Sequence, residues 1–176
     1  IIKQIKQIEN LVNEFSDFTR MPKPIFQSND IIEIINNNVS LLEELDKDIV
    51  FKFNLKKNKI LLKFDSEQIS RVIFNLVKNS IESIQEKSLK NTEFTKIIDI
   101  EIINKSDYIT VNITDNGTGF SIKNIKNIIK PYFTTKPKGS GLGLSIVNKI
   151  INDHNGSIKF SSNIDGAKVI LTLPKN

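Results

Sequence analysis

The order of the periodic segments constrains the fold of this chain more than any other feature of its sequence. Helical periods at residues 29–45, 65–87 and 141–156 are each followed by two short segments that have the character of β-strands. The predicted strands span residues 48–55, 59–64, 96–104, 108–114, 157–162 and 167–173. This order predicts an α/β (α+β) two-layer sandwich, in which helices cover one face of a mixed sheet.

The ends of these segments carry ordinary stop and start signals. Asp65 or Ser66 is expected to cap the central helix, and Gly156 is expected to close the last one. Turns are predicted near residues 57–59, 105–107 and 165–166, where polar residues separate paired strands.

The first twenty residues form a separate helical pattern. Ile1, Ile5, Ile8, Val12 and Phe15 follow a 4-3-4-3 spacing, which is typical of the seam of a coiled coil or a helical hairpin. The segment MPKP then ends the helix, because proline removes a backbone donor and restricts the residue before it. The helix begins without a cap and without a partner, so the chain is expected to be a fragment of a longer protein.

Composition disfavours several classes of function. No apolar run reaches the roughly 18–20 residues that cross a bilayer, no signal peptide opens the chain, and there is no cysteine for a disulfide or a thiolate metal site. The net charge of +5 comes from scattered lysines rather than from a basic block with interleaved aromatic residues. Nucleic-acid binding is therefore not expected.

Glycine marks the place where a ligand is expected. The chain has seven glycines, and five of them lie between residues 117 and 143: Gly117, Gly119, Gly139, Gly141 and Gly143. Glycine is used where the backbone bends unusually or approaches another group closely. Such clustering predicts one special region built from two loops.

The first cluster, DNGTGF at residues 115–120, allows two interpretations. Asn-Gly after an alternating strand is a hairpin signal, but residues 121–130 that follow have a helical period and predict a short helix instead. The alternative is a site at the strand end. There the Asp115 carboxylate could accept a hydrogen bond from an exocyclic amine. Adenine offers that donor, whereas guanine offers in its place an acceptor that would meet like charge. Gly117 and Gly119 would let a flat base approach the backbone.

The second cluster, KGSGLGLS at residues 138–145, fits neither a dinucleotide fingerprint nor a Walker loop, because the required glycine and Gly-Lys-Ser/Thr positions are absent. A glycine-rich loop that runs into a helix N-terminus favours an anion, although a flexible loop and cap is the simpler interpretation. Upstream, PYFTTKPK places two hydroxyl groups and two lysines where a mobile lid could cover phosphates.

The central helix has an unusual polar face. Asn75, Lys78, Asn79 and Glu82 cluster opposite its apolar face. A solvated surface is one interpretation, but asparagine is a poor helix former, and two amide oxygens four residues apart suit Mg²⁺. Lys78 could meet a phosphate at the same place.

Together these motifs resemble the ATP-binding domain of the sensor histidine kinases of two-component systems. The wider ATPase group, with its Bergerat-type fold, includes type II topoisomerases, Hsp90 chaperones and the MutL proteins. NLVKNSIES resembles the N box, DNGTGF the G1 box, PYFTTK the F box and GSGLGLSI the G2 box, in the expected order over roughly residues 28–174. NEFSDFTRMPKP further resembles the junction that follows the second dimerisation helix in nitrogen-regulation kinases of the NtrY type.

The resemblance implies a division of the chain and a set of site residues. Residues 1–24 would be part of a dimerisation helix with its linker, and residues 25–176 would be the ATP-binding catalytic domain. Asn79 would coordinate Mg²⁺, and Asp115 would bind the adenine amine. The full set of implied ATP-binding residues is Asn75, Lys78, Asn79, Asp115, Gly117, Gly119, Thr134, Thr135, Lys136, Gly139, Gly141, Leu142, Gly143 and Leu144.

The resemblance also implies a reaction. Hydrolysing relatives carry a glutamate at the position of Asn75, and an amide cannot act as that general base. ATP-dependent phosphoryl transfer to a protein histidine is therefore favoured over hydrolysis by a chaperone-like or topoisomerase-like ATPase. The only histidine, His154, lies near the end of the last helix and does not match the phosphoacceptor motif, so no catalytic residue is assigned. A non-catalytic ATP-sensing or interaction module is the other alternative.

The implied partners are those of a sensor kinase: ATP, a cognate response regulator, and a second copy of the parent protein. This part would be the cytoplasmic portion of a membrane-bound bacterial kinase, attached to the membrane only through N-terminal segments that this chain lacks.

Overall fold

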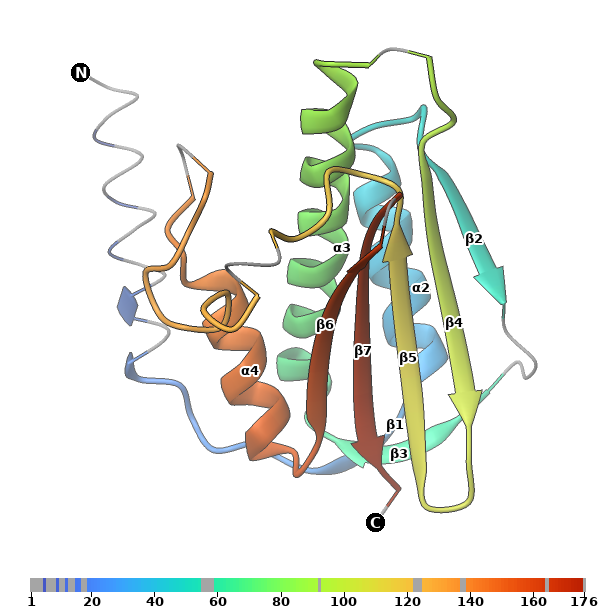
Figure 1. Cartoon of the computed structure of the whole chain (residues 1–176). Helices are drawn as coiled ribbons and strands as arrows, with labels where there is room; N and C mark the ends of the chain where they lie inside the picture. The colour runs from blue at the N-terminus through green and yellow to red at the C-terminus, as the bar shows by residue number, and fades with distance from the viewer. Residues whose placement is uncertain are drawn as a thin grey trace.

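The computed structural model describes residues 5, 9, 12, 15–16, 19–54, 59–91, 93–121, 125–136, 139–163 and 165–175. Within these residues, helices lie on one face of a mixed β-sheet, and a small second sheet sits near one end (Figure 1). The predicted two-layer arrangement is confirmed. The elements are β1 (Gln27–Asp30), α2 (Ile31–Glu43), β2 (Val50–Asn54), β3 (Leu61–Phe64), α3 (Ser66–Ser88), β4 (Ile97–Asn104), β5 (Tyr108–Asp115), α4 (Gly143–Asp153), β6 (Ser157–Asn163) and β7 (Gly166–Pro174).

The main sheet has the strand order β2-β4-β5-β7-β6 among the described residues. Strand β2 runs parallel to β4, and the remaining neighbours are antiparallel. The register sets Ile113 of β5 opposite Ile100 of β4 and Val169 of β7, so alternate residues form one apolar face. The predicted hairpins β4–β5 and β6–β7 are confirmed.

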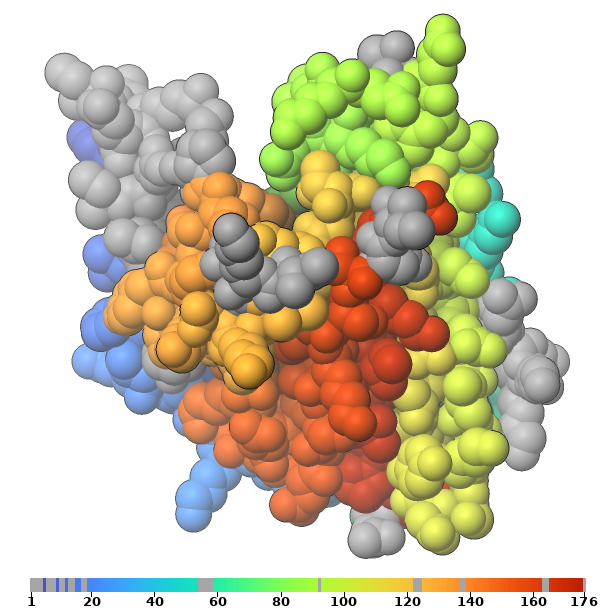
Figure 2. All heavy atoms as spheres, viewed as in Figure 1, coloured from blue at the N-terminus to red at the C-terminus, as the bar shows by residue number. Residues whose placement is uncertain are grey.

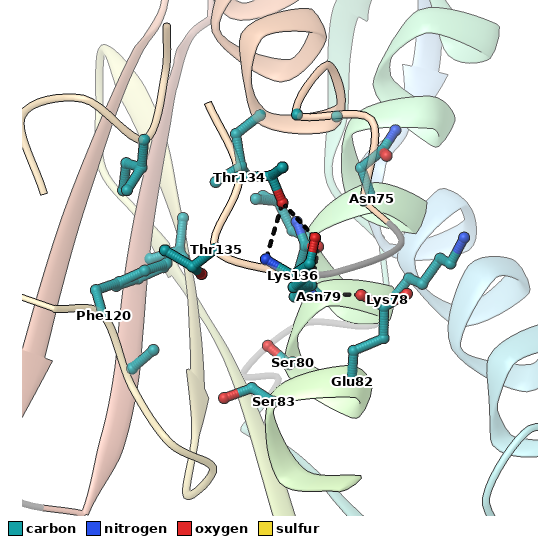
Figure 3. A pocket seen from close by; sticks show the side chains of 18 of the residues that line it. Asn75, Lys78, Asn79, Ser80, Glu82, Ser83, Phe120, Thr134, Thr135 and Lys136 are labelled. Carbon is teal, nitrogen blue, oxygen red and sulfur yellow. Dashed lines mark hydrogen bonds and ion pairs between the residues drawn. The ribbon is translucent and has the colours of Figure 1, made fainter. Parts of the chain in front are cut away.

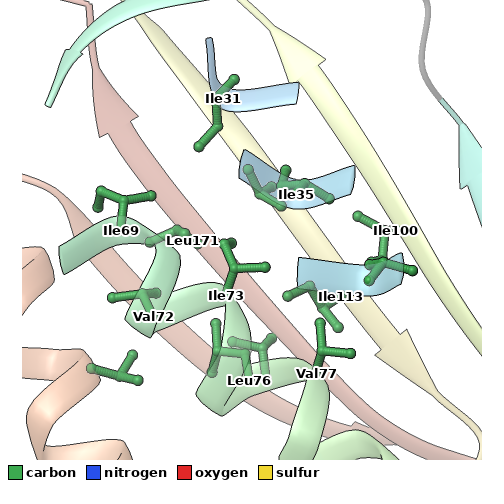
Figure 4. Close-up of a cluster of buried hydrophobic side chains, with 14 of the residues drawn as sticks. Ile31, Ile35, Ile69, Val72, Ile73, Leu76, Val77, Ile100, Ile113 and Leu171 are labelled. Atoms are coloured by element: carbon green, nitrogen blue, oxygen red, sulfur yellow. The ribbon is translucent and has the colours of Figure 1, made fainter. Parts of the chain in front are cut away.

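The core lies between this apolar face and the helices (Figure 4). Ile69, Ile73 and Val77 of α3 are fully buried because they share one side of the helix. They meet Ile113 of β5, and Ile35 of α2 lies in the same cluster. Full burial of each such side chain stabilises the fold by about 1.5–3 kcal/mol. The face of α3 opposite this cluster is left for polar residues.

Side-chain caps begin the two long helices. Asp30 accepts a hydrogen bond from the Ile32 N–H at the start of α2, and Asp65 accepts one from the Gln68 N–H at the start of α3. At the end of α4, Asn155 has a positive φ of 56°, and the Gly156 N–H donates to the Ile151 carbonyl at 2.9 Å. The predicted caps at Asp65 and Gly156 are confirmed.

Two predictions about local structure are wrong. Strands β2 and β3 are present but do not pair with each other; β3 pairs antiparallel with β1, a strand that the sequence pattern assigned partly to a helix. Residues 125–130 form turns and not a helix, whereas residues 122–124 lie outside the described residues. The predicted turn near residues 57–59 lies mostly outside them too.

The N-terminal pattern is helical at residues 5, 9, 12, 15–16 and 19. Ile5, Val12 and Phe15 of the predicted seam are exposed, and Ile1 and Ile8 lie outside the described residues. Phe15 stacks against Tyr132 with ring centroids 6.5 Å apart. In the part of the chain that the structure describes, no helix is both long and apolar enough to cross a bilayer.

Candidate functional site

A cavity of about 590 Å³ lies between the polar face of α3, the start of α4 and the adjoining ends of β5 and β7 (Figure 3). Ile128 and residues 133–136 of the loop that precedes α4 line one side of it. Figure 2 shows this loop in orange, to the left of and below the end of α3 in green. This volume falls within the range of pockets that hold nucleotide-sized ligands.

The cavity gathers most of the residues that the sequence predicted for a nucleotide site. Twelve of the fourteen line it: Asn75, Lys78, Asn79, Asp115, Gly119, Thr134, Thr135, Lys136, Gly139, Gly141, Gly143 and Leu144. Gly117 and Leu142 do not line it, and Leu142 is fully buried in the core. Three segments far apart in sequence therefore converge on one place.

Asp115 lies at one end of the cavity, at the last position of β5. Only 5% of it is exposed, and burial raises the pKa of its carboxyl above the ordinary value of 3.8. Hydrogen bonds from the Gly117 and Ala167 backbone and from the Ser80 and Ser83 hydroxyls oppose this rise in pKa. Hydrogen-bond donors of the protein thus hold the carboxylate in place. The same carboxylate lines the cavity, where a bound ligand could supply a further donor.

The residues after Asp115 show why the DNGTGF segment does not form a hairpin turn. The Asn116 side chain accepts from the Ile97 N–H at 2.9 Å and donates to the Thr95 carbonyl at 2.6 Å, so it ties the segment to the start of β4. A Cβ atom on Gly117 would lie 2.6 Å from the Ser83 carbonyl carbon. Gly117 therefore permits close packing on α3, whereas Gly119, with φ +72°, lines the cavity.

The two asparagines of α3 serve different neighbours. The Asn75 amide donates to the Arg71 carbonyl at 2.8 Å, and its oxygen lies beside Gly143, where a Cβ would approach it to 3.1 Å. The Asn79 oxygen instead accepts a hydrogen bond from the Lys136 ammonium at 3.2 Å. The two side chains therefore have different neighbours in this structure.

The second partner of Lys136 is Glu82, whose carboxylate accepts from the same ammonium (Figure 3). The sequence placed Glu82 on the polar face but gave it no role, because its partner is 54 residues away along the chain. Lys78 is exposed, with its ammonium 6.0 Å from the centre of the Phe74 ring. Lys136 is therefore the lysine that reaches the asparagine predicted to bind metal.

Helix α4 presents its N-terminus to the cavity. Gly143 and Leu144 line the wall, and the cap residue Leu142 provides no side-chain hydrogen bond to the first turn. The first N–H groups of a helix have no partner within the helix, and the helix dipole adds partial positive charge there. This end of the cavity is suited to an anion.

The covering loop is held in an unusual conformation. Tyr132 has φ 65°, which non-glycine residues adopt rarely, and Gly141 has φ +71°. A Cβ on Gly141 would lie 2.5 Å from the Tyr132 carbonyl carbon, so glycine allows the two loop segments to touch. Thr134 accepts from the Lys136 N–H at 3.0 Å and so fixes the backbone from which Lys136 extends.

Some cavity residues were not found from the sequence. Ser80, Ser83 and Thr118 line the wall near Asp115, and Phe120 and Phe133 add aromatic surface. The spacing of serine and threonine in a sequence does not distinguish the lining of a cavity from a solvent-exposed surface. Only the position of Ser80 and Ser83 on the same helix as Asn79 could have suggested their place.

The cavity residues also fit a bound divalent cation. Among the described residues, no three His, Cys, Asp or Glu side chains converge on one point. Mg²⁺ is commonly held by one or two protein oxygens together with substrate phosphates, so such a cluster is not needed. The Asn79 and Glu82 oxygens already share one positive ion, the Lys136 ammonium.

Comparison with known proteins identifies the family. Residues 64–176 match the model of the histidine kinase-, DNA gyrase B- and HSP90-like ATPases. The chain belongs to this family. The match begins at the end of β3 and covers every element that lines the cavity.

Relatives with similar sequences include a nitrogen regulation protein and a protein named as a putative sensor histidine kinase. The chain is 35% identical to the nitrogen regulation protein NtrY of Azorhizobium caulinodans over 98% of its length, and 33% identical to an NtrY-like protein of Rickettsia bellii over 97%. It spans only 22% and 27% of the length of these relatives.

Solved histidine kinases share the fold. The catalytic domain of histidine kinase ThkA matches with a TM-score of 0.75 at 29% identity, covering 86% of this chain and 96% of that domain. ThkA in complex with the response regulator TrrA matches with a TM-score of 0.81 at 25% identity, covering 99% of this chain and 49% of that one. The predicted resemblance to sensor histidine kinases is confirmed.

His154 lies outside the cavity. Its exposed fraction is 2%; Nε2 accepts from the Asp65 N–H at 3.1 Å, and Nδ1 donates to the Ile150 carbonyl at 2.8 Å. An Nε2 that accepts a hydrogen bond leaves the proton of a neutral imidazole on Nδ1. This histidine connects the end of α4 to the start of α3.

Proposed function

We propose that this chain is the ATP-binding catalytic region of a sensor histidine kinase. It binds Mg·ATP in the cavity and presents the γ-phosphate to a histidine on another segment or chain. The observation that carries the proposal is the polarity of the cavity, with a buried carboxylate at one end and an anion-binding helix N-terminus at the other.

The buried end of the cavity supports adenine recognition. The Asp115 carboxylate accepts a hydrogen bond from the adenine amine. Gly119 lines the cavity close to it, with a φ of +72° that favours glycine. Guanine has a carbonyl oxygen where adenine has its amine, so it would place an acceptor against a carboxylate. We therefore expect ATP to bind more tightly than GTP.

The other end supports binding of the triphosphate. The α4 N-terminus at Gly143 and the loop residues Thr134, Thr135 and Lys136 surround the place where the phosphates would lie. Asn79 supplies an oxygen ligand for Mg²⁺. When bound, this ion would neutralise negative charge on the phosphates and orient the γ-phosphate.

Transfer rather than hydrolysis is supported by Asn75. Its amide is occupied with the Arg71 carbonyl and cannot accept a proton from water. His154 is buried and hydrogen-bonded through both nitrogens, so we do not propose it as the acceptor. The response regulator, the dimeric parent and its cytoplasmic location at a membrane stay predictions from the family.

The proposal is tested by mixing the chain with radiolabelled ATP, Mg²⁺ and a fragment of the parent kinase that carries its phosphoacceptor histidine. We expect label on that histidine, with little phosphate released by the chain alone. Asp115→Asn should strongly reduce the labelling, and Glu93→Gln, an exposed change outside the cavity, should not. Steady phosphate release without labelling would contradict the proposal and favour an ATPase.

A further inference from the structure

Lys136 is the cation around which the phosphate end of the cavity is arranged. It extends from the covering loop to α3, where its ammonium contacts the Asn79 oxygen at 3.2 Å and forms an ion pair with Glu82. The side chains of Lys136 and Glu82 are 35% and 38% exposed. A pair this exposed contributes little to stability, so a stabilising role does not explain why the loop holds it.

The two oxygens that hold Lys136 form a geometry that also suits a metal ion. Asn79 and Glu82 are three residues apart on α3, so their side chains lie on the same face of the helix. Both oxygens contact a single ammonium, which shows that one cation can reach both at once. An amide oxygen and a carboxylate oxygen, completed by phosphates and water, form a typical Mg²⁺ environment.

The negative charge of Glu82 explains why it would need a cation beside it both with and without bound ATP. A bare carboxylate beside the triphosphate of ATP would repel it strongly in a partly desolvated cavity. In this structure the Lys136 ammonium neutralises Glu82. If Lys136 moved toward the phosphates, Glu82 would require another positive ion in the same place.

We propose that Glu82 is a second protein ligand of the nucleotide-bound Mg²⁺, and that Lys136 holds its place until Mg·ATP binds. On binding, Asn79 and Glu82 exchange the ammonium for the metal, and the released Lys136 turns to the phosphates. The exchange links occupancy of the metal position to the loop that carries Lys136. This inference rests on the proposed binding of Mg·ATP and names the residues that make that binding depend on the metal.

The first test measures ATP affinity by calorimetry across a range of Mg²⁺ concentrations and in EDTA. In Glu82→Gln, we expect the Mg²⁺ concentration for half-maximal ATP binding to rise by about tenfold or more, because a charged ligand is lost. ATP affinity in EDTA should stay equal or increase, because Lys136 is no longer held by a carboxylate.

Glu86→Gln is the matched control, since Glu86 lines the same cavity one helical turn further along α3 and has the same charge. Whatever its ATP affinity, the Mg²⁺ concentration for half-maximal ATP binding should equal that of the unaltered protein. Equal Mg²⁺ dependence in the two variants would overturn the inference, as would a loss of affinity in Glu82→Gln that is the same with and without metal.

The second test needs no nucleotide. Binding of Mn²⁺ to the nucleotide-free protein is followed by electron paramagnetic resonance. Lys136→Met should bind Mn²⁺ about fivefold or more tightly than the unaltered chain, because the resident cation is gone. Lys130→Met, an exposed change of the same charge in the same loop, should not.

The two tests separate the inference from the proposed function. If none of these proteins bound ATP at any Mg²⁺ concentration, the proposed function would fail, whatever the result with Mn²⁺. If ATP bound normally but Lys136→Met bound Mn²⁺ no more tightly than Lys130→Met, the exchange would be disproved and the proposed function would stand.

Discussion

Asp115 is buried, and the burial of its carboxylate lowers the stability of the folded protein. Because burial raises its pKa above 3.8, the native protein holds this proton at pH values where the unfolded chain has released it. The carboxyl therefore lowers the stability of the native state as the pH rises through that raised pKa. Such a group is typical of a site where function outweighs stability.

Comparison with Asp115→Asn isolates this effect. We expect the free energy of unfolding of the unaltered chain, minus that of the variant, to increase as the pH falls from 7 toward 4. Chemical denaturation at each pH measures it.

Asp46 offers a control of opposite sign. Burial alone would raise the pKa of Asp46, but hydrogen bonds from Lys96, the Asp48 backbone and Gln85 lower it below 3.8. The free energy of unfolding of the unaltered chain, minus that of Asp46→Asn, should therefore decrease as the pH falls below about 4. Parallel curves for Asp115→Asn and the unaltered chain would show that Asp115 is not perturbed.

At the residue scale, the sequence predicted most of the residues that line the cavity but not every contact between them. Asp115 and Asn79 lie where their motifs implied because strand ends and helix faces follow from local patterns. The contact of Glu82 with Lys136 could not be predicted, because it depends on how a loop folds back over a helix. A glycine in the sequence, such as Gly117, does not reveal which neighbouring atoms leave no room for a Cβ.

At the element scale, His154 joins two helices that lie side by side. His154→Ala would leave the Asp65 N–H without its acceptor and open a small cavity next to Phe26, whose ring centroid lies 5.1 Å away. We expect the free energy of unfolding to fall by about 2–3 kcal/mol, measured by urea denaturation. ATP affinity should change by less than about twofold, because His154 does not line the cavity.

His154→Gln keeps an acceptor and should recover part of the lost stability. A variant at position 154 that retained full stability but lost transfer of phosphate to the acceptor fragment would show that His154 acts in the chemistry. That result would overturn its structural assignment.

The elements differ in how well the sequence predicted them. Helix α3 and the hairpins β4–β5 and β6–β7 follow from long regular periods and short turns. Strand β1 has the sequence QSND, which is poor in strand formers, and it exists through pairing with β3. Strand β2 pairs with β4, which is distant in sequence, and no local pattern reveals such a partner.

Residues 125–130 show a further limit of periodicity. Their apolar spacing matches a helix, but Pro131 disfavours helical backbone at Lys130, and a segment this short gains little from helix formation alone. Ile128 is nevertheless buried, so an apolar residue of this segment is removed from solvent without helical structure.

At the scale of the whole molecule, the N-terminal helix presents an apolar seam to solvent. Ile5, Val12 and Phe15 are exposed by 59%, 57% and 47%. We expect weak self-association of the chain that strengthens with concentration, because this seam matches the spacing of a helical bundle. Multi-angle light scattering over a range of concentrations measures the mass.

Val12→Glu should abolish this association and leave ATP affinity unchanged, since Val12 lies outside the cavity. Leu89→Glu, which alters an apolar residue that is 87% exposed but lies outside the seam, should leave the association intact. A constant monomer mass at hundreds of micromolar, or equal effects of the two substitutions, would refute the prediction.

In the proposed complex with ATP, the Asp115 carboxylate accepts a hydrogen bond from the amino group of adenine. The most direct measurement compares the affinities of Mg·ATP and of the analogue that lacks this amine, purine riboside triphosphate, for the unaltered chain and for Asp115→Asn. In the unaltered chain, Asp115 Oδ1 accepts a hydrogen bond from the Gly117 N–H at 2.9 Å. In the variant, the amide oxygen would keep this hydrogen bond, and the NH₂ group would face the base.

We expect Asp115→Asn to weaken Mg·ATP binding by about 10- to 100-fold, the value of a hydrogen bond to a charged group, and to leave binding of the analogue nearly unchanged. Equal losses for both nucleotides, or no loss for ATP, would contradict the account.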